Sequence, residues 1–448
     1  MNRKDATVLE PPRKFSGMVR HWGPGLVLTA SVVGSGEVIG VPALGAQAGF
    51  AVLWLVLVSC VVKLPLQITI GRQAIQTGRT TLQLIDDVPG PRWGASWFIW
   101  CFFATLVLAN LQQGAMIAGC GQVLTLLVPG IDPRVWAGAL VALTIALLVL
   151  GSYGLLERLS TILVVSFTLA TVVCVGFLQT TDYHMAPLEV LGGLRPRLSR
   201  EYVGLALGVF AVTGIGTTEI VQYPYWCLDK GYGRHAGVFD GSEAWYRRAR
   251  GWIRVMHADA ALSMVVYTLI TVAFYSLGAS VLHRLGERPE GMSMIATLSR
   301  MYTETLGVWA FAVFVMGAFF ALYSTLLVSV AGNTVMYLDA LSLMGLRRLQ
   351  QPAVRERWRR AFVILLPLVQ LGLFFAIQMP VAMVKVGALG QTIMLPILAG
   401  AIVYIRHKKL DPRLAPSRLT DVLLWGACVL IACVAGYGIY VSATGATS

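Results

Sequence analysis

The chain has 448 residues, of which 56% are apolar and only 13% are charged, and its formal net charge is +13. So few charged side chains exclude an ordinary water-soluble protein, whose surface carries many more of them. The positive charge lies in short clusters between apolar runs, without a Gly-rich phosphate loop or interleaved aromatic residues, which argues against nucleic-acid binding.

Apolar runs of about 20 residues recur from Gly23 to Tyr440, each long enough to cross a bilayer as a helix. The weak alternating pattern of a membrane β-barrel does not occur. The polar, basic segment at residues 1–14 does not have the form of a cleavable signal peptide. Hydropathy therefore predicts an all-α integral membrane protein with about eleven spans, at residues 22–48, 50–73, 96–127, 135–152, 158–179, 201–227, 256–281, 306–335, 360–378, 380–405 and 420–442.

Lysine and arginine mark one side of the membrane. By the positive-inside rule, the segments rich in these residues face the cytoplasm, namely Arg3–Arg20, Arg72–Arg92, Lys230–Arg254, Arg347–Arg360 and Arg406–Arg418. With an odd number of spans, the N-terminus is then cytoplasmic and the C-terminus extracytoplasmic. We expect a multi-pass protein of the cell (inner) membrane whose partner is the lipid bilayer, and the sequence leaves the oligomeric state open.

The first span holds a carboxylate in its middle, within the stretch SVVGSGEVIGVP at residues 31–42. Gly34, Ser35 and Gly36 precede Glu37; glycine lowers the cost of unwinding a helix, and serine can replace lost backbone hydrogen bonds. A charge near the bilayer centre costs roughly 2.5–3.5 kcal/mol unless it is paired, protonated or in contact with water. Glu37 therefore indicates either a functional site at a helix break or one half of a buried ion pair.

The second span carries Lys63 near its middle, two residues before Pro65. This lysine is too far from the ends of the span for its ammonium group to reach the interface easily. Placed beside Glu37, or beside Glu219 in the sixth span, its ammonium group would neutralise part of the negative charge of a site or form a structural ion pair. Lys63 is therefore a candidate pathway or coupling residue.

The sixth span repeats the spacing of the first. The stretch TGIGTTEIVQYP at residues 213–224 shares the pattern G-x-x-E-x-x-x-x-P, with Glu219 in the position of Glu37. If spans 1–5 and 6–10 form two units, the odd number of spans per unit gives these units opposite orientations. Such inverted repeats are typical of transporters in which the first helix of each repeat is broken near the bilayer midplane.

The expected organisation is a cytoplasmic tail at 1–21, a first repeat at 22–182, an inverted second repeat at 200–405, and a basic loop with an eleventh helix at 406–448. The candidate substrate-binding residues at the two breaks are Glu37, Glu219, Gly34, Gly36, Thr213, Gly216, Thr217 and Thr218. No cofactor is expected apart from a bound divalent cation, for which Glu37 and Glu219 are the candidate ligands.

Six stretches carry a family resemblance: GPGLVLTASVVGSGEVIG, GFAVLWLVLVSCVVKLPLQITIGRQAIQTGR, GSYGLLERL, HADAAL, ASVLH and AGNTVMYLDAL. They resemble the natural resistance-associated macrophage protein (Nramp) family of divalent metal transporters, and the resemblance extends from about Gly23 to Ala399. It implies an eleven-helix, leucine-transporter-like fold of two inverted five-helix repeats, with helices 1 and 6 broken and the N-terminus in the cytoplasm.

The metal-binding motifs of that family are changed in this chain. Typical members carry D-P-G-N in helix 1, where this sequence has GSGE at 34–37. They carry M-P-H in helix 6, where it has GTT at 216–218, with Glu219 in place of the usual Asn, and the preceding carbonyl position falls at Thr213. Loss of the methionine removes a soft ligand, and two glutamates among hydroxyl and amide groups are typical of sites for calcium, magnesium or manganese.

The residues that the resemblance links to proton movement are changed as well. The family's D-x-x-E motif of helix 3 reads NLQQ at 110–113, and helix 10 has Gln391 one turn before the aligned position, Met394. Because both acids are replaced by amides and the helix 6 histidine is absent, proton coupling by the family's usual route is not expected. Asn110, Gln113 and Gln391 are candidate pathway residues.

Three functions fit these observations. The first is a secondary active or facilitative transporter that moves a small cation, most simply a divalent metal, by alternating access, with Glu37 and Glu219 binding it. The second is a transporter of an organic solute, such as an amino acid or an amine, with Lys63 in place of a coupling cation. The third is a membrane sensor without transport, although the longest polar loop, 229–250, is short. No constellation typical of an enzyme stands out.

Overall fold

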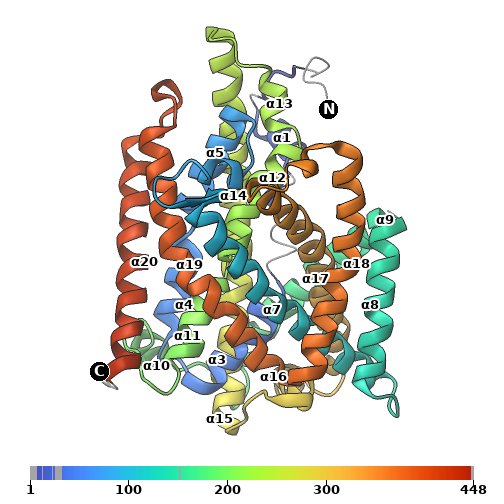
Figure 1. The fold of residues 1–448 in the computed structure, drawn as a ribbon. Coiled ribbons are helices and arrows are strands. Elements are labelled where there is room, and N and C mark those ends of the chain that lie inside the picture. Colours follow the sequence, from blue (N-terminus) through green and yellow to red (C-terminus); the bar gives the residue numbers. More distant parts are fainter. Residues whose placement is uncertain (1–7, 13, 23, 26–32, 151–152, 445–448) are drawn as a thin grey trace.

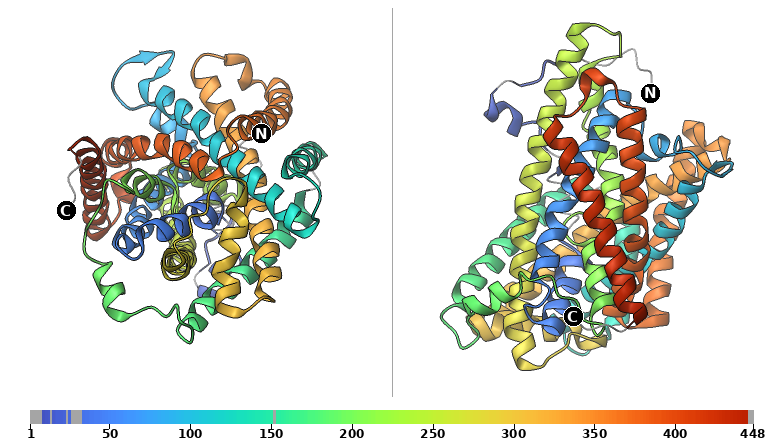
Figure 2. Two further views of the ribbon diagram at one scale, coloured as in Figure 1. Left: turned by 90° about the horizontal axis from the view of Figure 1, so that it is seen from below. Right: turned by 90° about the vertical axis from the view of Figure 1, so that its left-hand side faces the viewer.

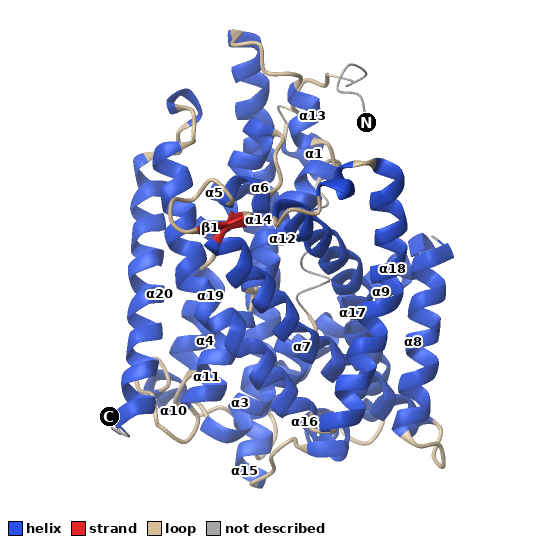
Figure 3. Cartoon of the chain, in the orientation of Figure 1, coloured by secondary structure: helices blue, strands red, loops and turns tan. Residues whose placement is uncertain are grey.

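The computed structural model describes residues 8–12, 14–22, 24–25, 33–150 and 153–444, which form a bundle of helices (Figures 1 and 3). Nine helices within these residues are long and apolar enough to cross a bilayer. Two more predicted spans are described in part: the first from Val33 onward, and the fifth, whose apolar part is Val165–Leu178. The prediction of an all-α membrane protein is confirmed; the predicted number of about eleven spans corresponds to these nine helices together with the two partly described spans.

The first half of the chain begins with α1 (Phe15–Val19), and the described part of the first span consists of the π-helical segment η2 (Ser35–Gly40) and α3 (Val41–Ala48). The second span is α4 (Leu53–Val62) and α5 (Leu64–Thr77), followed by α6 (Thr81–Ile85). The short strands β1 (Arg92–Trp93) and β2 (Ala95–Ser96) pair antiparallel. Spans three to five are α7 (Trp97–Leu127), α8 (Pro133–Leu150) and α9 (Tyr153–Leu178).

The second half begins with α10 (Pro187–Gly192), and its first span is α11 (Val203–Val212) and α12 (Thr217–Asp229). Next come α13 (Tyr232–Ala236), α14 (Glu243–Leu277), η3 (Gly278–Leu282), α15 (His283–Leu285), η4 (Gly291–Ser293) and α16 (Met294–Leu306). The remaining elements are α17 (Ala310–Leu343), η5 (Arg347–Gln350), α18 (Pro352–Ile377), α19 (Pro380–Lys408), η6 (Pro412–Leu414) and α20 (Arg418–Thr444).

The sixth span is interrupted, as the sequence predicts. Residues 213–216 separate α11 from α12, and Gly214 has φ +69°, a conformation that residues with a side chain rarely adopt. In the first span, regular winding begins at Ser35, after a turn at Val33 and Gly34. Residues 26–32 of the predicted first span, which precede this turn, lie outside the described residues.

The second span is divided at Lys63 by a proline. Pro65 has no N–H group to donate to the carbonyl of Val61, one turn earlier, and that carbonyl accepts from the backbone N–H of Lys63 instead. Lys63 is therefore the C-terminal cap residue of α4 and the N-terminal cap residue of α5, and its side chain is attached at the junction of the two helices.

The helix α7 lies at the centre of the bundle, where it packs against α8, α17, α18 and α19. The two views agree that α8 and α20 lie on opposite sides of the bundle, while α1 and the C-terminal end of α20 lie at opposite ends (Figures 1 and 2). Because α7 packs against α8, α17, α18 and α19, most of the side chains in its C-terminal half are buried.

Three boundaries differ clearly from the prediction: α17 ends at Leu343 rather than at 335, α18 begins at Pro352 rather than at 360, and the start of the seventh span differs most. The seventh span, predicted from residue 256, begins at Glu243 as α14, and its first turns extend beyond most other helices at the end where α1 lies (Figure 1). The hydroxyl of Ser242 accepts from the backbone N–H of Trp245 and caps this helix. Hydropathy marks the limits of the membrane, whereas a charged but helix-forming segment continues the same helix into water.

Candidate functional site

A small cavity lies where η2 and α12 meet α7, α17 and α19. Its volume is about 20 Å³, room for about one water-sized particle. The predicted residues that line it are Glu37, Glu219, Gly34, Gly36, Gln113 and Gln391. The other lining residues are Ser35, Gln112, Met116, Val212, Thr325 and Ser329.

Glu37 contributes an unpaired carboxylate oxygen to this cavity. The residue is 0% exposed and lies in the first turn of η2, where the aligned backbone dipoles favour a negative charge. Its Oε1 accepts a hydrogen bond of 2.8 Å from the backbone N–H of Gly214, in the break of the sixth span. Its Oε2 has no hydrogen-bond partner among the described residues. A buried oxygen of this kind is costly unless a donor or a cation reaches it.

Glu219 brings a second carboxylate to the cavity from the first turn of α12. The hydroxyl of Thr218 donates to its Oε2 at 2.9 Å. Gly216, which caps α12, leaves the space that this carboxylate occupies, because a Cβ atom at residue 216 would overlap with Glu219 Oε2. The absence of a side chain at Gly216 therefore allows the carboxylate of Glu219 to fold back over the first turn of α12.

A chain of amides joins the start of α12 to α19 and α7. Gln391 Nε2 donates to Gln112 Oε1 at 3.0 Å, and Gln391 Oε1 accepts from the backbone N–H and the hydroxyl of Thr218, both at 3.3 Å. The hydroxyl of Thr217 donates to the Gln391 carbonyl at 3.0 Å. Within the described part of the chain, Gln112 Nε2 and Gln113 Oε1 have no partner, so both amides keep a free polar atom beside the cavity.

Lys63 is fully buried but does not form the ion pair that its sequence position suggested. Among the described residues, no ion pair within 4.0 Å joins it to Glu37 or Glu219. Its Nζ donates instead to the carbonyls of Thr213 and Ala211, at 2.7 and 3.3 Å, and to Ser59 Oγ at 3.1 Å. The lysine therefore binds the backbone at the helix break rather than a carboxylate.

Asn110, expected to lie along the pathway, has its contacts elsewhere. Its Nδ2 donates to the hydroxyl of Tyr337 at 2.9 Å, and its Oδ1 accepts from Gln370 Nε2 at 3.0 Å. These partners belong to α17 and α18. Asn110 is not among the residues that line the cavity.

Six lining residues were not among the predicted site residues: Ser35, Gln112, Met116, Val212, Thr325 and Ser329. Gln112 is adjacent to the predicted Gln113, and Met116 lies about one turn further along α7. Thr325 and Ser329 are four residues apart, a spacing that places two hydroxyls on one face of a helix and could have indicated a polar lining. Met116 also supplies a thioether, from a position of α7 outside the motif that the family resemblance singled out.

No group of three or more His, Cys, Asp or Glu side chains that could hold a metal ion occurs among the described residues. A cation in the cavity would therefore be bound by the two glutamates together with amide, hydroxyl or backbone oxygens. Such a ligand set suits hard divalent cations, which prefer oxygen.

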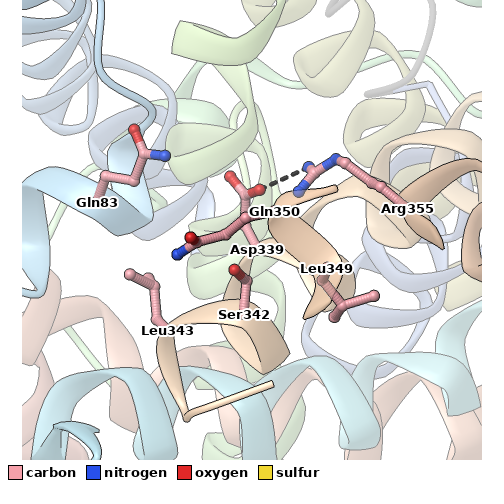
Figure 4. Close-up of a pocket in the computed structure, with 7 residues that line it drawn as sticks. All are labelled: Gln83, Asp339, Ser342, Leu343, Leu349, Gln350 and Arg355. Atoms are coloured by element: carbon pink, nitrogen blue, oxygen red, sulfur yellow. Dashed lines mark hydrogen bonds and ion pairs between the residues drawn. The ribbon is translucent and has the colours of Figure 1, made fainter. Parts of the chain in front are cut away.

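A second pocket, of about 290 Å³, lies beside the basic segment that follows α17 (Figure 4). Asp339 is its central acid: Oδ1 accepts from Arg355 at 2.6 Å, and Oδ2 accepts from the hydroxyls of Tyr225 and Thr80 at 2.8 and 3.0 Å. One carboxylate thus joins α17 and α18 to α12 and to the start of α6. Figure 4 shows Gln83, Ser342 and Gln350 around the same space.

Comparison with known sequences gives three findings. The sequence model of the family described as Natural resistance-associated macrophage protein-like matches residues 25–441. An uncharacterised protein of Pasteurella multocida is 23% identical over 337 residues, which are 74% of this chain and 72% of that protein. The metal transporter Nramp2 of Populus trichocarpa is 29% identical over 212 residues, but these are 46% of this chain and only 37% of that relative.

Solved structures with the same fold include the manganese transporter of Eremococcus coleocola, with a TM-score of 0.67, 14% identity, and coverage of 98% of this chain and 91% of that one. MhsT, in complex with L-phenylalanine, has a TM-score of 0.52 and 14% identity over 97% of this chain and 100% of its own. Mhp1, a nucleobase–cation symporter, has a TM-score of 0.53 and 13% identity over 97% and 95%. These likenesses show the leucine-transporter-like fold that the sequence predicts.

Proposed function

The chain belongs to the Nramp family, whose sequence model covers nearly all of it, and from this premise we propose that it is a secondary transporter of a small divalent cation. Its helices make it a multi-pass membrane protein. The distribution of lysine and arginine supports a cell-membrane protein with a cytoplasmic N-terminus and an extracytoplasmic C-terminus.

The observation that carries the proposal is the unpaired Oε2 of Glu37 beside the carboxylate of Glu219 in one cavity. Two carboxylates so placed repel each other unless a positive group lies between them. Gln113 Oε1, also without a partner among the described residues, adds a neutral oxygen to the same wall. The arrangement favours magnesium, manganese or calcium over ions that need several sulfur or nitrogen ligands.

The size of the cavity supports an ion over an organic solute. A volume of about 20 Å³ accepts about one water-sized particle, whereas an amino acid needs several times more. The structural neighbours MhsT and Mhp1 were solved with organic ligands, so this fold can serve either class. The organic alternative needs a wider cavity than the conformation described above provides.

Alternating access is the mechanism that the broken sixth span favours. The four-residue interruption at residues 213–216 lets α11 and α12 change their mutual angle without breaking a continuous helix. We assign the two moving units to the predicted repeats at residues 22–182 and 200–405. Glu37 from the first unit and Glu219 from the second then share one ion across the boundary.

The test is calorimetry of the purified protein against magnesium, manganese, calcium and cadmium ions, and against a panel of amines and amino acids, followed by flux into liposomes. We expect binding of a divalent ion that Glu37→Gln and Glu219→Gln each weaken by at least about 30-fold, the equivalent of roughly 2 kcal/mol for loss of a buried charge partner. Glu201→Gln, which changes an exposed glutamate, serves as the control.

Wild-type affinity in both glutamine variants would rule out this site. Saturable binding of an amine or amino acid with no response to divalent ions would establish the organic alternative. Divalent binding without any flux into liposomes would indicate a sensor rather than a transporter.

A further inference from the structure

Two side chains of the second span hold the carbonyl groups at the end of α11. Because α11 ends before the break, its last carbonyls have no helical amide to accept from. Ser59 Oγ donates to the carbonyl of Phe210 at 2.8 Å, and Lys63 Nζ donates to those of Ala211 and Thr213 at 3.3 and 2.7 Å. Ser59 and Lys63 stand one turn apart in the second span and together satisfy this helix end.

These oxygens form the kind of site that binds a small cation. The carbonyl end of a helix carries partial negative charge, and in transporters with interrupted helices such carbonyls coordinate the coupling cation. An ammonium group has three N–H donors, and Lys63 Nζ has three oxygen neighbours here, the third being Ser59 Oγ at 3.1 Å. Its side chain is 0% exposed, so the charge is held entirely by these protein groups.

A single peptide group connects this ammonium to the cavity. The carbonyl of Thr213 accepts from Lys63 Nζ, and the N–H of the same peptide, on Gly214, donates to Glu37 Oε1 at 2.8 Å. The positive charge polarises this peptide so that its N–H binds the carboxylate more strongly. With Oε1 fixed in this way, Oε2 of Glu37 is the oxygen left for the cavity.

We propose that the ammonium group of Lys63 is a tethered monovalent cation that occupies the cation position at the end of α11 and, through the Thr213–Gly214 peptide, orients Glu37 toward the transported ion. The orientation of Glu37 rests on the proposed function, whereas the tethered cation does not. Lys63 is a positioning residue, and no free sodium or potassium ion is needed beside it.

The experiment compares the wild type with Lys63→Ala in sodium, potassium, choline and methylammonium chloride at matched ionic strength, with thermal unfolding and divalent-ion calorimetry as readouts. We expect the wild type to be equally stable, with equal affinity, in all four salts. Lys63→Ala is expected to unfold at lower temperature in choline, to bind the divalent ion about 10- to 100-fold more weakly, and to regain both properties selectively in methylammonium.

Two variants control for shape and charge. Lys63→Met fills the same space without a charge, and we expect its weakened affinity not to recover in methylammonium. Lys385→Ala removes an exposed lysine of α19 and should behave as the wild type. If Lys63→Ala does not fold, the salt series on the wild type and on Lys63→Met remains decisive.

A wild type that needs sodium or potassium for stability or affinity would overturn the proposal, as would a Lys63→Ala protein that responds equally to methylammonium and choline. Failure of the proposed function gives a different result: no variant binds a divalent ion, yet methylammonium still raises the unfolding temperature of Lys63→Ala.

Discussion

Gln391 fixes the orientation of Gln112: the Nε2 of Gln391 donates to the Oε1 of Gln112 at 3.0 Å, which leaves the Nε2 of Gln112 beside the cavity without a partner among the described residues. The other end of the Gln391 amide accepts from Thr218, at the start of α12. One side chain of α19 therefore sets both the first turn of α12 and one polar wall of the cavity.

The first prediction concerns this amide. Gln391→Leu removes a donor and an acceptor at once and leaves buried groups of Thr218 and Gln112 unpaired, at a cost of about 1–3 kcal/mol. We expect a lower unfolding temperature and divalent affinity reduced by about tenfold or more, measured by thermal unfolding and calorimetry. Gln179→Leu, at an exposed position after α9, should change neither. Unchanged affinity in Gln391→Leu would show that the amide chain does not shape the site.

Gly216 gives a sharper test of the second carboxylate. Its φ of −69° suits alanine, so Gly216→Ala is expected to fold. The new Cβ would overlap with Glu219 Oε2 and lie 3.0 Å from Gln391 Oε1, which forces the flexible carboxylate to move. Calorimetry should show affinity weaker by about tenfold, or roughly 1.4 kcal/mol. Gly400→Ala, where the added methyl meets nothing within 4 Å, is the matched control, and equal affinity in both variants would contradict the prediction.

Met116 offers a prediction about selectivity. It brings a thioether to the cavity wall, and sulfur stabilises cadmium more than magnesium or manganese. Met116→Leu keeps the volume and removes the sulfur. We expect cadmium affinity to fall by about three- to tenfold while magnesium and manganese affinities stay the same. A parallel loss for all three ions would mean that the methionine acts through packing.

The contacts of Asp339 predict a stability effect away from the cavity. Asp339→Ala leaves Arg355, Tyr225 and Thr80 without their shared acceptor. Removal of one partner of a buried ion pair costs about 3–5 kcal/mol, and because the Arg355 side chain is 35% exposed, we expect about 2–3 kcal/mol. Thermal unfolding of the purified protein measures this cost. Glu10→Ala breaks an exposed pair with Arg247 and is expected to change stability by at most about 0.5 kcal/mol.

The loop between α19 and α20 gives a prediction about pH. The hydroxyl of Tyr246 donates to Asp411 Oδ2 at 2.6 Å and holds the pKa of that carboxyl below its usual value. A carboxyl with a lowered pKa stabilises the fold above its unfolded pKa, and that stabilisation is lost as the pH falls through the folded pKa. Tyr246→Phe should therefore speed hydrogen exchange in η6 at pH 7, and the difference from the wild type should vanish only when the pH falls below the lowered folded pKa of Asp411, which lies below the ordinary aspartate value of about 3.9.

Tyr232→Phe controls for the loss of a tyrosine hydroxyl, since Tyr232 donates to the carbonyl of His21 and not to this loop. Should the difference in exchange between Tyr246→Phe and the wild type persist at low pH, the hydrogen bond to Asp411 would not be its cause.

Much of the architecture could be predicted because the position of a membrane span and of a helix break depends mainly on residues that are close together in the sequence. The apolar runs located the spans, and the shared spacing around Glu37 and Glu219 identified two acids that line one cavity. The break of the sixth span could be read from the glycines at 214 and 216, since the backbone at Gly214 needs a positive φ.

The lining of α7 could not be predicted in the same way. Asn110 and Gln113 were candidates because they occupy the two acidic positions of the family's D-x-x-E motif, and Gln112, which lies between those positions, was left out. α7 is surrounded by other helices, and its polar residues face different neighbours: Asn110 binds Gln370 of α18, whereas Gln112 binds Gln391 of α19. Which neighbour lies on which side follows from packing between distant spans.

The partner of Lys63 was also beyond the sequence. A lysine in the middle of a span, in a sequence with two glutamates in other spans, suggested an ion pair. A sequence identifies charged side chains, but it does not show which backbone carbonyls lack a helical hydrogen bond. The carbonyls of Ala211 and Thr213 become available only because the sixth span is interrupted, and they meet Lys63 only because the second span packs beside that interruption.

The narrowness of the cavity has a kinetic consequence. A divalent ion carries a shell of several water molecules, and a space of about 20 Å³ admits it only after nearly all of them have left. The rate of transport would then depend on how readily each ion loses its bound water. Magnesium releases water reluctantly, so it would be transported more slowly than calcium or manganese even if it bound with the same affinity.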